Sequence, residues 1–351
     1  MARTSMIIIF LALCINVSAQ TPSSDTSAQA YEFDWRLQFS GVADNREYFN
    51  SVTTPQTILG ARFGATAGLT IDQAHHIRFG GTVMQEYGSE FGFDKATPYA
   101  YYYYDGMPSE FVFGIFPRKM LSTYPRALLT DTLYFYRPQV EGALFRLKGA
   151  FGEQSLWLDW TSRQTDTIRE TFLFGFDGTL VYKSLFMRHT FLYYHFAGPA
   201  VRIPGDHVRD NGGGSLATGV TMQKLWLFDT LQVAMGGLGS YDRTRGVTDW
   251  QSSAGATALL YMSAPRFSLR YEHYWGESHK LDWGDRFFKA KQYGRLDMGV
   301  IPILHRNITA RFIYSLHIIE SKLDHQQAFF VSADIGGKLA GWSSKHNSSE
   351  E

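Results

Sequence analysis

Apolar and polar residues alternate with a period of two along most of this chain. Between Leu59 and Leu69, every odd-numbered residue is apolar, and the residues between them are glycine, arginine or threonine. The same alternation runs from Phe33 to Phe39 and from Phe267 to Tyr271. A period of two places successive side chains on opposite faces of a β-strand. The sequence therefore predicts strands that each have one apolar face and one polar or small face.

The number and length of these segments point to a membrane barrel. About sixteen segments of roughly 9–14 residues alternate in this way, and a tilted strand that crosses a bilayer needs about 9–11 residues. Short connections with turn residues, as at 105–108, alternate with longer ones, the longest near 117–137 and the last near 319–326. This alternation is typical of outer-membrane proteins. We expect an all-β, membrane-spanning, antiparallel up-and-down β-barrel of about 16 strands (range about 14–18) in the bacterial outer membrane.

Composition excludes several other classes of protein. The 33 basic and 33 acidic residues balance to zero, which argues against a general nucleic-acid binder. Beyond the first twenty residues no run of 18 apolar residues occurs, so a helical membrane protein is excluded. Aromatic residues reach 16% and gather at segment ends, as at 101–104 and 193–194. Aromatic girdles lie at membrane interfaces, so this placement favours a barrel over a soluble β-sandwich.

The first residues have the pattern of a secretory signal. Arg3 precedes an apolar run from Met6 to Ile15, and small or compact residues end the segment at Ala19. We expect a signal peptide at 1–19, a flexible leader at 20–29, the barrel at 30–339 and a polar tail at 340–351. A lipoprotein signal with lipidated Cys14 is disfavoured because bulky Leu13 precedes that cysteine. Cys14 is the only cysteine, so the mature chain has no thiol.

Two stretches and the overall pattern carry a family resemblance. The first stretch is Asp44-Asn45-Arg46-Glu47-Tyr48-Phe49. The second begins with Phe116-Pro117-Arg118, continues through Tyr124-Pro125-Arg126-Ala127-Leu128-Leu129-Thr130-Asp131, and adds Pro138 and Glu141-Gly142. With its strand pattern over the whole mature chain, the sequence resembles bacterial outer-membrane porin-like barrels. The resemblance implies passive diffusion of small hydrophilic solutes, a third outer loop that folds into the barrel, and a homo-oligomer such as a trimer. The polar tail departs from the terminal aromatic residue of many such barrels.

Charged residues of the third loop and of the polar strand faces are the candidate pore residues. A basic loop folded inward would focus anions at the narrowest point, although a surface loop touching lipid phosphates is the alternative. The wall charges nearly balance, so we expect at most a weak anion preference. The alternative is that these wall charges only solvate a water-filled lumen and have no role in selectivity. The pore-constriction candidates are Arg118, Lys119, Arg126, Asp131 and Arg137. The lumen-wall candidates are Arg36, Arg62, Arg78, Arg188, Arg270, Glu272, Arg295, Asp297 and Arg311.

No residue pattern predicts catalysis or metal binding. Asp206-His207 and Asp324-His325 fall on expected outer loops without a second acidic pair. We expect His189 and His195 to face lipid as neutral interfacial side chains. His75-His76 point to opposite faces of a strand, which does not suit a shared metal. We expect no catalytic residue, no metal, no cofactor and no enzymatic activity.

The preferred function is therefore a passive channel, with outer-membrane lipid and small solutes as partners and no nucleic acid. A non-conducting barrel that anchors or assembles a surface complex is the first alternative, and a plugged lumen would favour it. A barrel enzyme or a transporter of hydrophobic ligands is the second. A lateral opening or an apolar inner pocket would favour that alternative.

Overall fold

A computed structural model describes residues 29–90, 92–201 and 203–344 of the chain. The expected signal peptide at 1–19 and nearly all of the leader lie outside the described residues. We placed the end of the barrel at residue 339, and the last strand continues to Ser344. The rest of the expected tail, 345–351, is also outside the described part.

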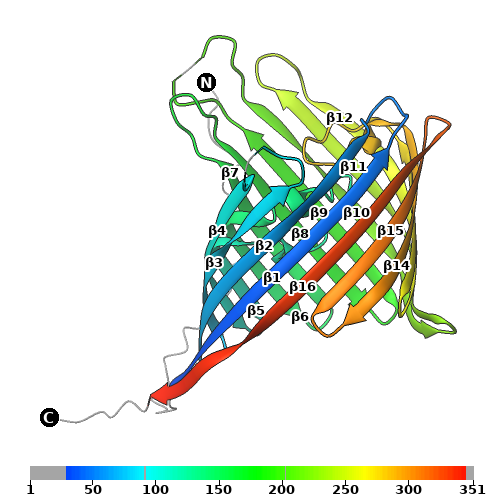
Figure 1. The fold of residues 1–351 in the computed structure, drawn as a ribbon. Coiled ribbons are helices and arrows are strands. Elements are labelled where there is room, and N and C mark those ends of the chain that lie inside the picture. Colours follow the sequence, from blue (N-terminus) through cyan, green and yellow to red (C-terminus); the bar gives the residue numbers. More distant parts are fainter. Residues whose placement is uncertain (1–28, 91, 202, 345–351) are drawn as a thin grey trace.

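Sixteen antiparallel strands close into one barrel, in which each strand pairs with its neighbours in sequence and β1 pairs with β16 (Figure 1). This confirms the predicted fold. The strands are β1 Gln29–Glu47, β2 Gln56–Ile71, β3 His75–Glu86, β4 Lys95–Gly106, β5 Ser109–Pro117, β6 Gln139–Gly149, β7 Gly152–Ser162, β8 Thr171–Tyr182, β9 Leu185–Phe196, β10 Arg209–Leu225, β11 Phe228–Thr244, β12 Gln251–Ala264, β13 Phe267–Gly276, β14 Gln292–His305, β15 Ile308–Ile319 and β16 Lys322–Ser344.

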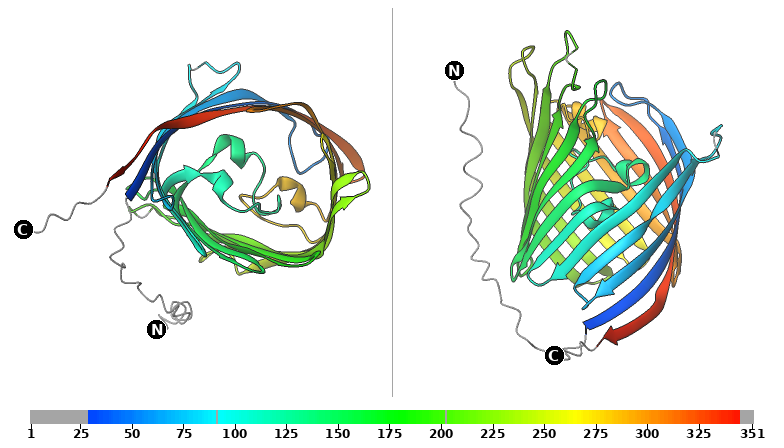
Figure 2. Two further views of the ribbon diagram at one scale, coloured as in Figure 1. Left: turned by 90° about the horizontal axis from the view of Figure 1, so that it is seen from below. Right: turned by 90° about the vertical axis from the view of Figure 1, so that its left-hand side faces the viewer.

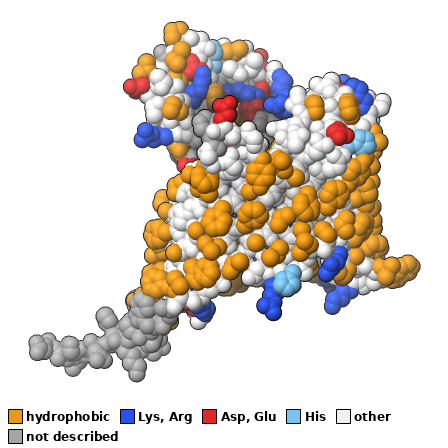
Figure 3. All heavy atoms as spheres, in the orientation of Figure 1, with side chains coloured by type: hydrophobic (Ala, Val, Ile, Leu, Met, Phe, Trp, Pro, Cys, Tyr) orange, Lys and Arg blue, Asp and Glu red, His pale blue; other side chains and the backbone are white. Residues whose placement is uncertain are grey.

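The apolar phase of the strands faces outward. Phe39, Phe63 and Phe79 are 39%, 49% and 60% exposed, whereas Arg62, which precedes Phe63, is 7% exposed and faces the lumen. Hydrophobic side chains cover the middle of the wall, and charged side chains gather near its two ends (Figure 3). A lipid-facing arginine or lysine would cost about 2–4 kcal/mol at the bilayer midplane, so this phase suits a membrane.

Seven of the eight outer connections are longer loops, as the sequence predicts, but the last is not. The expected loop at 319–326 is a two-residue turn, in which Glu320 and Ser321 have φ values of 51° and 61°. Two positive φ values define the turn whose twist matches an antiparallel hairpin. Asparagine and glycine usually reveal such a turn in a sequence, and neither is present here.

Two outer loops fold into the barrel instead of standing above it (Figure 2). The third loop, residues 118–138, contains the 3₁₀ turn η2 (Arg118–Met120) and the short helix α1 (Leu133–Tyr136). The seventh loop, residues 277–291, contains η3 (Arg286–Lys289). Within the described part of the chain, no helix is long and apolar enough to cross a membrane.

Candidate functional site

The two inner loops give the barrel an apolar core. Leu128 and Leu129 of the third loop and Phe287 of the seventh loop are 0%, 7% and 2% exposed. They belong to one buried cluster with wall residues such as Trp157 and Leu192. An apolar core of this kind fills the space that an open channel of this strand number would leave to water.

Arg118, a predicted constriction residue, is sealed inside the wall of the barrel. Its Nη2 lies 2.5 Å from Asp159 Oδ2, and the side chains of the two residues are 2% and 0% exposed. Arg118 Nε also donates to the carbonyl of Arg137 at 2.7 Å. Because Asp159 neutralises this charge without contact with solvent, Arg118 does not present a free positive charge to a solute.

Arg126 binds three carboxylates, of which Glu272 and Asp297 belong to the opposite wall and Asp131 to the third loop itself. Its guanidinium lies 2.6 Å from Asp131, 2.8 Å from Glu272 and 2.8 Å from Asp297. Burial would lower the pKa of Arg126, but these carboxylates raise it well above its ordinary value. Burial likewise opposes ionisation of Asp131, but Arg126 outweighs it and lowers the Asp131 pKa. The group therefore stays charged and paired, which fixes the loop in place.

Lys119 and Arg137 are the remaining constriction candidates. Burial, followed by the charge of Arg36, lowers the pKa of Lys119. Arg137 stacks over the ring of Trp283 with its Cζ 5.5 Å from the ring centroid. The five candidates therefore share one loop but do not form an open ring of positive charge.

The nine lumen-wall candidates lie on the lumen face of the strands, and most of them have partners. Arg36, Arg78, Arg270 and Arg295 pair with acidic residues, namely Asp334, Asp34, Glu272 and Asp297. Arg62 donates to the carbonyl of Phe135 in the third loop. Among the described residues, Arg188 and Arg311 form no ion pair. The wall therefore has little unpaired charge of either sign.

The outer face of the barrel contains a different kind of polar group at its external end. Along β9 the outward side chains change from Met187 and Phe191 to Tyr193 and His195, beside the loop after Phe196. Across the strand pair, His195 stands opposite Asp210 of β10. These residues lie at the external end of the outer face of the barrel.

Four side chains form this group, which we call the outer-rim group: Tyr193, His195, Asp210 and Arg245. His195 Nδ1 lies 3.3 Å from Asp210 Oδ1, and the Tyr193 hydroxyl donates to the same oxygen at 2.8 Å. Arg245 donates to both Asp210 oxygens at 2.6 Å and 2.9 Å. The Asp210 side chain is 4% exposed and that of His195 is 19% exposed, so a buried carboxylate orients a reachable imidazole.

His273, another outward histidine, has a tyrosine partner but no bonded carboxylate among the described contacts. His273 Nδ1 lies 3.1 Å from the Tyr271 hydroxyl, the same distance as between Tyr193 and His195. His273 stands opposite Ala258 on one side and Gly294 on the other. Within the described residues, His195 is the one histidine paired with an acid.

A rival polar group lies at the seam between β1 and β16. His325 Nδ1 is 2.7 Å from the Tyr314 hydroxyl, and His325 stands opposite Glu47 in the register. Asn45 donates to Glu47 at 3.0 Å and accepts from Thr57 at 3.1 Å. The Glu47 carboxylate is bound by Asn45, and no hydrogen bond joins it to His325 among the described contacts.

The sequence predicts an outward His195 but not its partner Asp210. The adjacent Asp206 and His207 do not act together, because Asp206 pairs with Arg169 and His207 Nδ1 lies 3.0 Å from the Arg245 carbonyl. Asp210 meets His195 only through the register of β9 with β10, which no local motif encodes. In the described residues, no group of three histidine, cysteine or acidic side chains is placed to hold a metal.

Solved structures share this architecture. The loop L8 deletion mutant of OmpT, an outer membrane protein of Vibrio cholerae, superposes with a TM-score of 0.55 at 9% identity over 88% of this chain and 100% of that one. Salmonella typhi OmpF in complex with daunomycin gives 0.52 at 9% identity over 86% and 97%. An anion-selective porin from Comamonas acidovorans gives 0.50 at 8% identity over 88% and 100%. At such identity these similarities show the fold: the chain is a bacterial outer-membrane β-barrel.

Sequence comparison identifies the family. A family model described as Lipid A 3′-O-deacylase-type matches residues 25–336, and the chain belongs to this family. No curated relative matches the sequence. Because this family is one of enzymes, our expectation that the chain is not an enzyme is wrong. The alternation of apolar and polar side chains predicts a membrane-spanning barrel. It gives no information about catalytic residues on the lipid-facing side of that barrel.

Proposed function

We propose that this protein is an outer-membrane hydrolase that releases an ester-linked acyl chain from lipid A. Membership of the deacylase-type family supports the reaction class. Lipid A lies in the outer leaflet, so its ester bonds lie at the level of the external rim and outside the barrel wall. The outer-rim group has this location, and the contact of His195 with buried Asp210 is the observation that carries the proposal.

His195 acts as the general base in the proposed reaction. Its Nδ1–H donates to Asp210, which leaves Nε2 to take a proton from a water molecule. The water oxygen attacks the ester carbonyl carbon and gives a tetrahedral oxyanion. When this oxyanion collapses, the bond to the sugar oxygen breaks, and the imidazolium returns its proton to that oxygen. The products are a fatty acid and a free sugar hydroxyl.

Asp210 is a positioning residue for this step. A buried carboxylate fixes the imidazole tautomer and stabilises the transient imidazolium, the role it has in hydrolase triads. The Tyr193 hydroxyl reinforces this arrangement by its bond to the same oxygen. The Arg245 side chain is 51% exposed, so it can also face an anionic lipid headgroup while it holds Asp210.

Aromatic side chains flank the proposed site. The ring of Phe172 lies 5.0 Å from that of His195 and stacks on Trp160 at 5.5 Å. Such rings lie at the depth where headgroups meet acyl chains. They give an ester carbonyl an apolar surface beside the imidazole.

Mass spectrometry of lipid A tests the proposal. The wild-type chain and the His195→Gln variant are produced in the outer membrane of a host whose lipid A is fully acylated. We expect the wild type to remove the mass of one acyl chain and His195→Gln to leave lipid A intact. The His273→Gln variant is the matched control and should act as the wild type does. Intact lipid A with folded wild-type protein would overturn the proposal, and loss of activity in His325→Gln alone would move the site to the β1–β16 seam.

A passive channel for small hydrophilic solutes is the second candidate, favoured by the sixteen-strand barrel. Unpaired Arg188 and Arg311 would give it a weak anion preference, and a trimer remains part of this proposal. The inner loops oppose it, because they fill the lumen with an apolar core. The same inner loops are compatible with a non-conducting barrel that anchors a surface complex. Planar-bilayer conductance separates these functions, since a channel gives discrete steps and the other two give none.

A further inference from the structure

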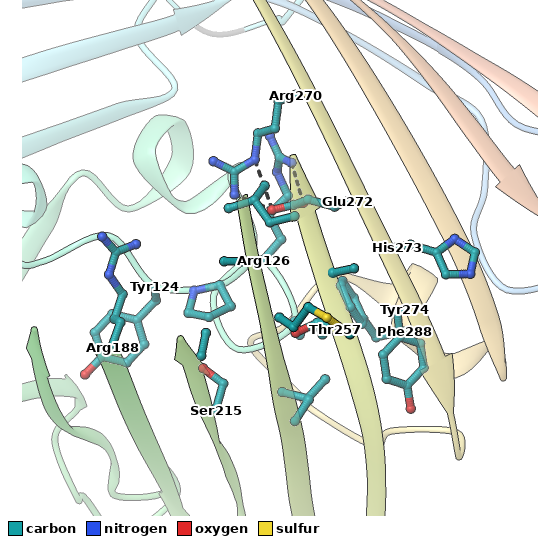
Figure 4. Close-up of a pocket in the computed structure, with 18 of the residues that line it drawn as sticks. Tyr124, Arg126, Arg188, Ser215, Thr257, Arg270, Glu272, His273, Tyr274 and Phe288 are labelled. Carbon is teal, nitrogen blue, oxygen red and sulfur yellow. Dashed lines mark hydrogen bonds and ion pairs between the residues drawn. The ribbon is translucent and has the colours of Figure 1, made fainter. Parts of the chain in front are cut away.

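A partly open pocket lies inside the barrel, beside the part of the third loop that runs from Thr123 to Ala127 (Figure 4). Its cavity volume is about 140 Å³. Strands β9 to β14 form its wall, and the seventh loop contributes Phe288. The pocket is separated from the outer-rim group by the barrel wall, because the residues of that group face outward.

One side of the pocket is apolar. Phe186, Ala234, Leu238 and Phe288 are 8%, 5%, 3% and 7% exposed, and Tyr274 is 1% exposed. These residues come from β9, β11, β13 and the seventh loop, so the surface exists only in the folded barrel. An alkyl chain that packs against such a surface gains free energy because it leaves water.

The other side carries more positive than negative charge. Figure 4 shows Arg126, Arg188 and Arg270 with Glu272 toward one side of the pocket. Arg270 pairs with Glu272, but that carboxylate also lies 2.8 Å from Arg126. Among the described residues Arg188 forms no ion pair, and its Cζ lies 5.8 Å from the ring of Phe186.

An apolar cavity next to under-neutralised arginines matches an amphiphilic monoanion. Guanidinium groups bind carboxylates through paired hydrogen bonds, and a short alkyl chain gains free energy by leaving water. We propose that this pocket binds a medium-chain fatty carboxylate, with its head at Arg188 and Arg270 and its chain against Phe186, Leu238 and Phe288. The proposal goes beyond the hydrolase function and holds whether the fatty acid is a reaction product or comes from the surroundings.

The lining of the pocket extends along the barrel. Arg188 and Arg270 are close to the first residues of their strands, Leu185 and Phe267, which follow short turns. Tyr274 and Tyr293, which also line the pocket, lie near the external ends of β13 and β14. The carboxylate head would therefore lie in the periplasmic part of the pocket.

Calorimetric titration of octanoate into the protein in lipid nanodiscs tests this inference, with the heat from empty nanodiscs subtracted. We expect a saturable single site whose dissociation constant rises at least fivefold in Arg188→Ala. Arg311→Ala is the matched control, because Arg311 is also an unpaired lumen arginine but lies outside the pocket. Its dissociation constant should equal that of the wild type. Octanol should give no saturable heat, since it lacks the charge.

A second variant tests the apolar half. Ala234→Phe fills the cavity and should abolish octanoate binding, and heat-modifiable migration on a gel shows whether the barrel is folded. Equal affinities of Arg188→Ala and Arg311→Ala would overturn the proposal. Saturable binding of octanol as tight as that of octanoate would overturn it as well, as would failure of the wild type to bind. None of these readouts depends on acyl release from lipid A.

Discussion

The Arg118–Asp159 pair and the Arg245–Asp210 pair have nearly equal N–O distances, 2.5 Å and 2.6 Å, but opposite surroundings. In the first pair both side chains are closed off from solvent, at 2% and 0% exposure. In the second pair the arginine is 51% exposed, and the aspartate also contacts a tyrosine and a histidine. The first pair serves to hold a loop, whereas the aspartate of the second also contacts His195, a side chain that can exchange protons.

This difference indicates that the Arg118–Asp159 pair contributes to stability and that the residues around Asp210 contribute to activity. A buried ion pair loses much free energy when one partner is removed, because the other charge stays buried without compensation. Loss of Arg245 should cost less, because this arginine is 51% exposed and the buried Asp210 keeps its contacts with Tyr193 and His195. Substitutions in the lumen should therefore change folding, and substitutions at the outer rim should change activity.

The largest effect is expected for His195→Gln. Loss of a general base lowers the rate by about 10²–10⁴-fold. The rate of acyl release from lipid A by the purified protein in mixed micelles measures this effect. His273→Gln removes an outward histidine with the same tyrosine contact and should stay within about twofold of the wild type. If both variants lost acyl release to the same extent, activity would depend on any interfacial histidine and not on the pairing of His195 with Asp210.

Arg118→Met is expected to lower the free energy of unfolding by about 3–5 kcal/mol, because Asp159 would remain buried and unpaired. Urea unfolding in nanodiscs, followed by tryptophan fluorescence, measures it. Arg245→Met should lower that free energy by less than Arg118→Met does, because Asp210, although buried, keeps its contacts with Tyr193 and His195. Similar losses in the two variants would remove the distinction between the two pairs.

A smaller effect on activity is expected for Tyr193→Phe. It removes one hydrogen bond to Asp210 and leaves those from His195 and Arg245. A bond worth about 1 kcal/mol corresponds to roughly fivefold in rate. Tyr271→Phe, at the corresponding position beside His273, should leave acyl release unchanged. A full loss of activity in Tyr193→Phe would instead assign the chemistry to its hydroxyl.

Acidification should loosen the seventh loop slightly. Burial lowers the pKa of His279, whose Nδ1 lies 2.6 Å from the Ser240 hydroxyl. The folded loop therefore requires neutral imidazole, so its stability is complete above the unfolded pKa of 6.5 and declines as pH falls below it. Hydrogen exchange of residues 277–291 at pH 7 and pH 5 measures this change. The pKa of Asp285, raised by burial, acts in the opposite direction, so comparison with His279→Gln isolates the histidine. A pH response that is identical in His279→Gln would contradict the prediction.

The strands could be predicted from the sequence because the bilayer imposes a strict rule on each position. Phe63 must face lipid and Arg62 must not, and this rule repeats in every strand. The turn at Glu320–Ser321 escaped prediction because its positive φ values occur without glycine or asparagine. The ion pairs of Arg126 could not be predicted for another reason. Glu272 and Asp297 follow it by more than a hundred residues and contact it only across the closed barrel.

The proposed site was harder to predict than the fold. His195 and Asp210 are separated by a loop, and a shift of one residue in the β9–β10 register would turn them to opposite faces. The sequence contains several outward histidines with tyrosine partners, so His195 has no local signal of its own. Only the pairing of strands distinguishes it from His273.

The most direct test of this account is a paired measurement on Asp210→Asn, in which acyl release and urea unfolding are followed on the same preparation. We predict a rate at least about 10²-fold below that of the wild type, because the amide no longer fixes the imidazole tautomer, with the free energy of unfolding changed by less than about 1 kcal/mol. A wild-type rate of acyl release in folded Asp210→Asn would contradict the central claim that this carboxylate makes His195 the base.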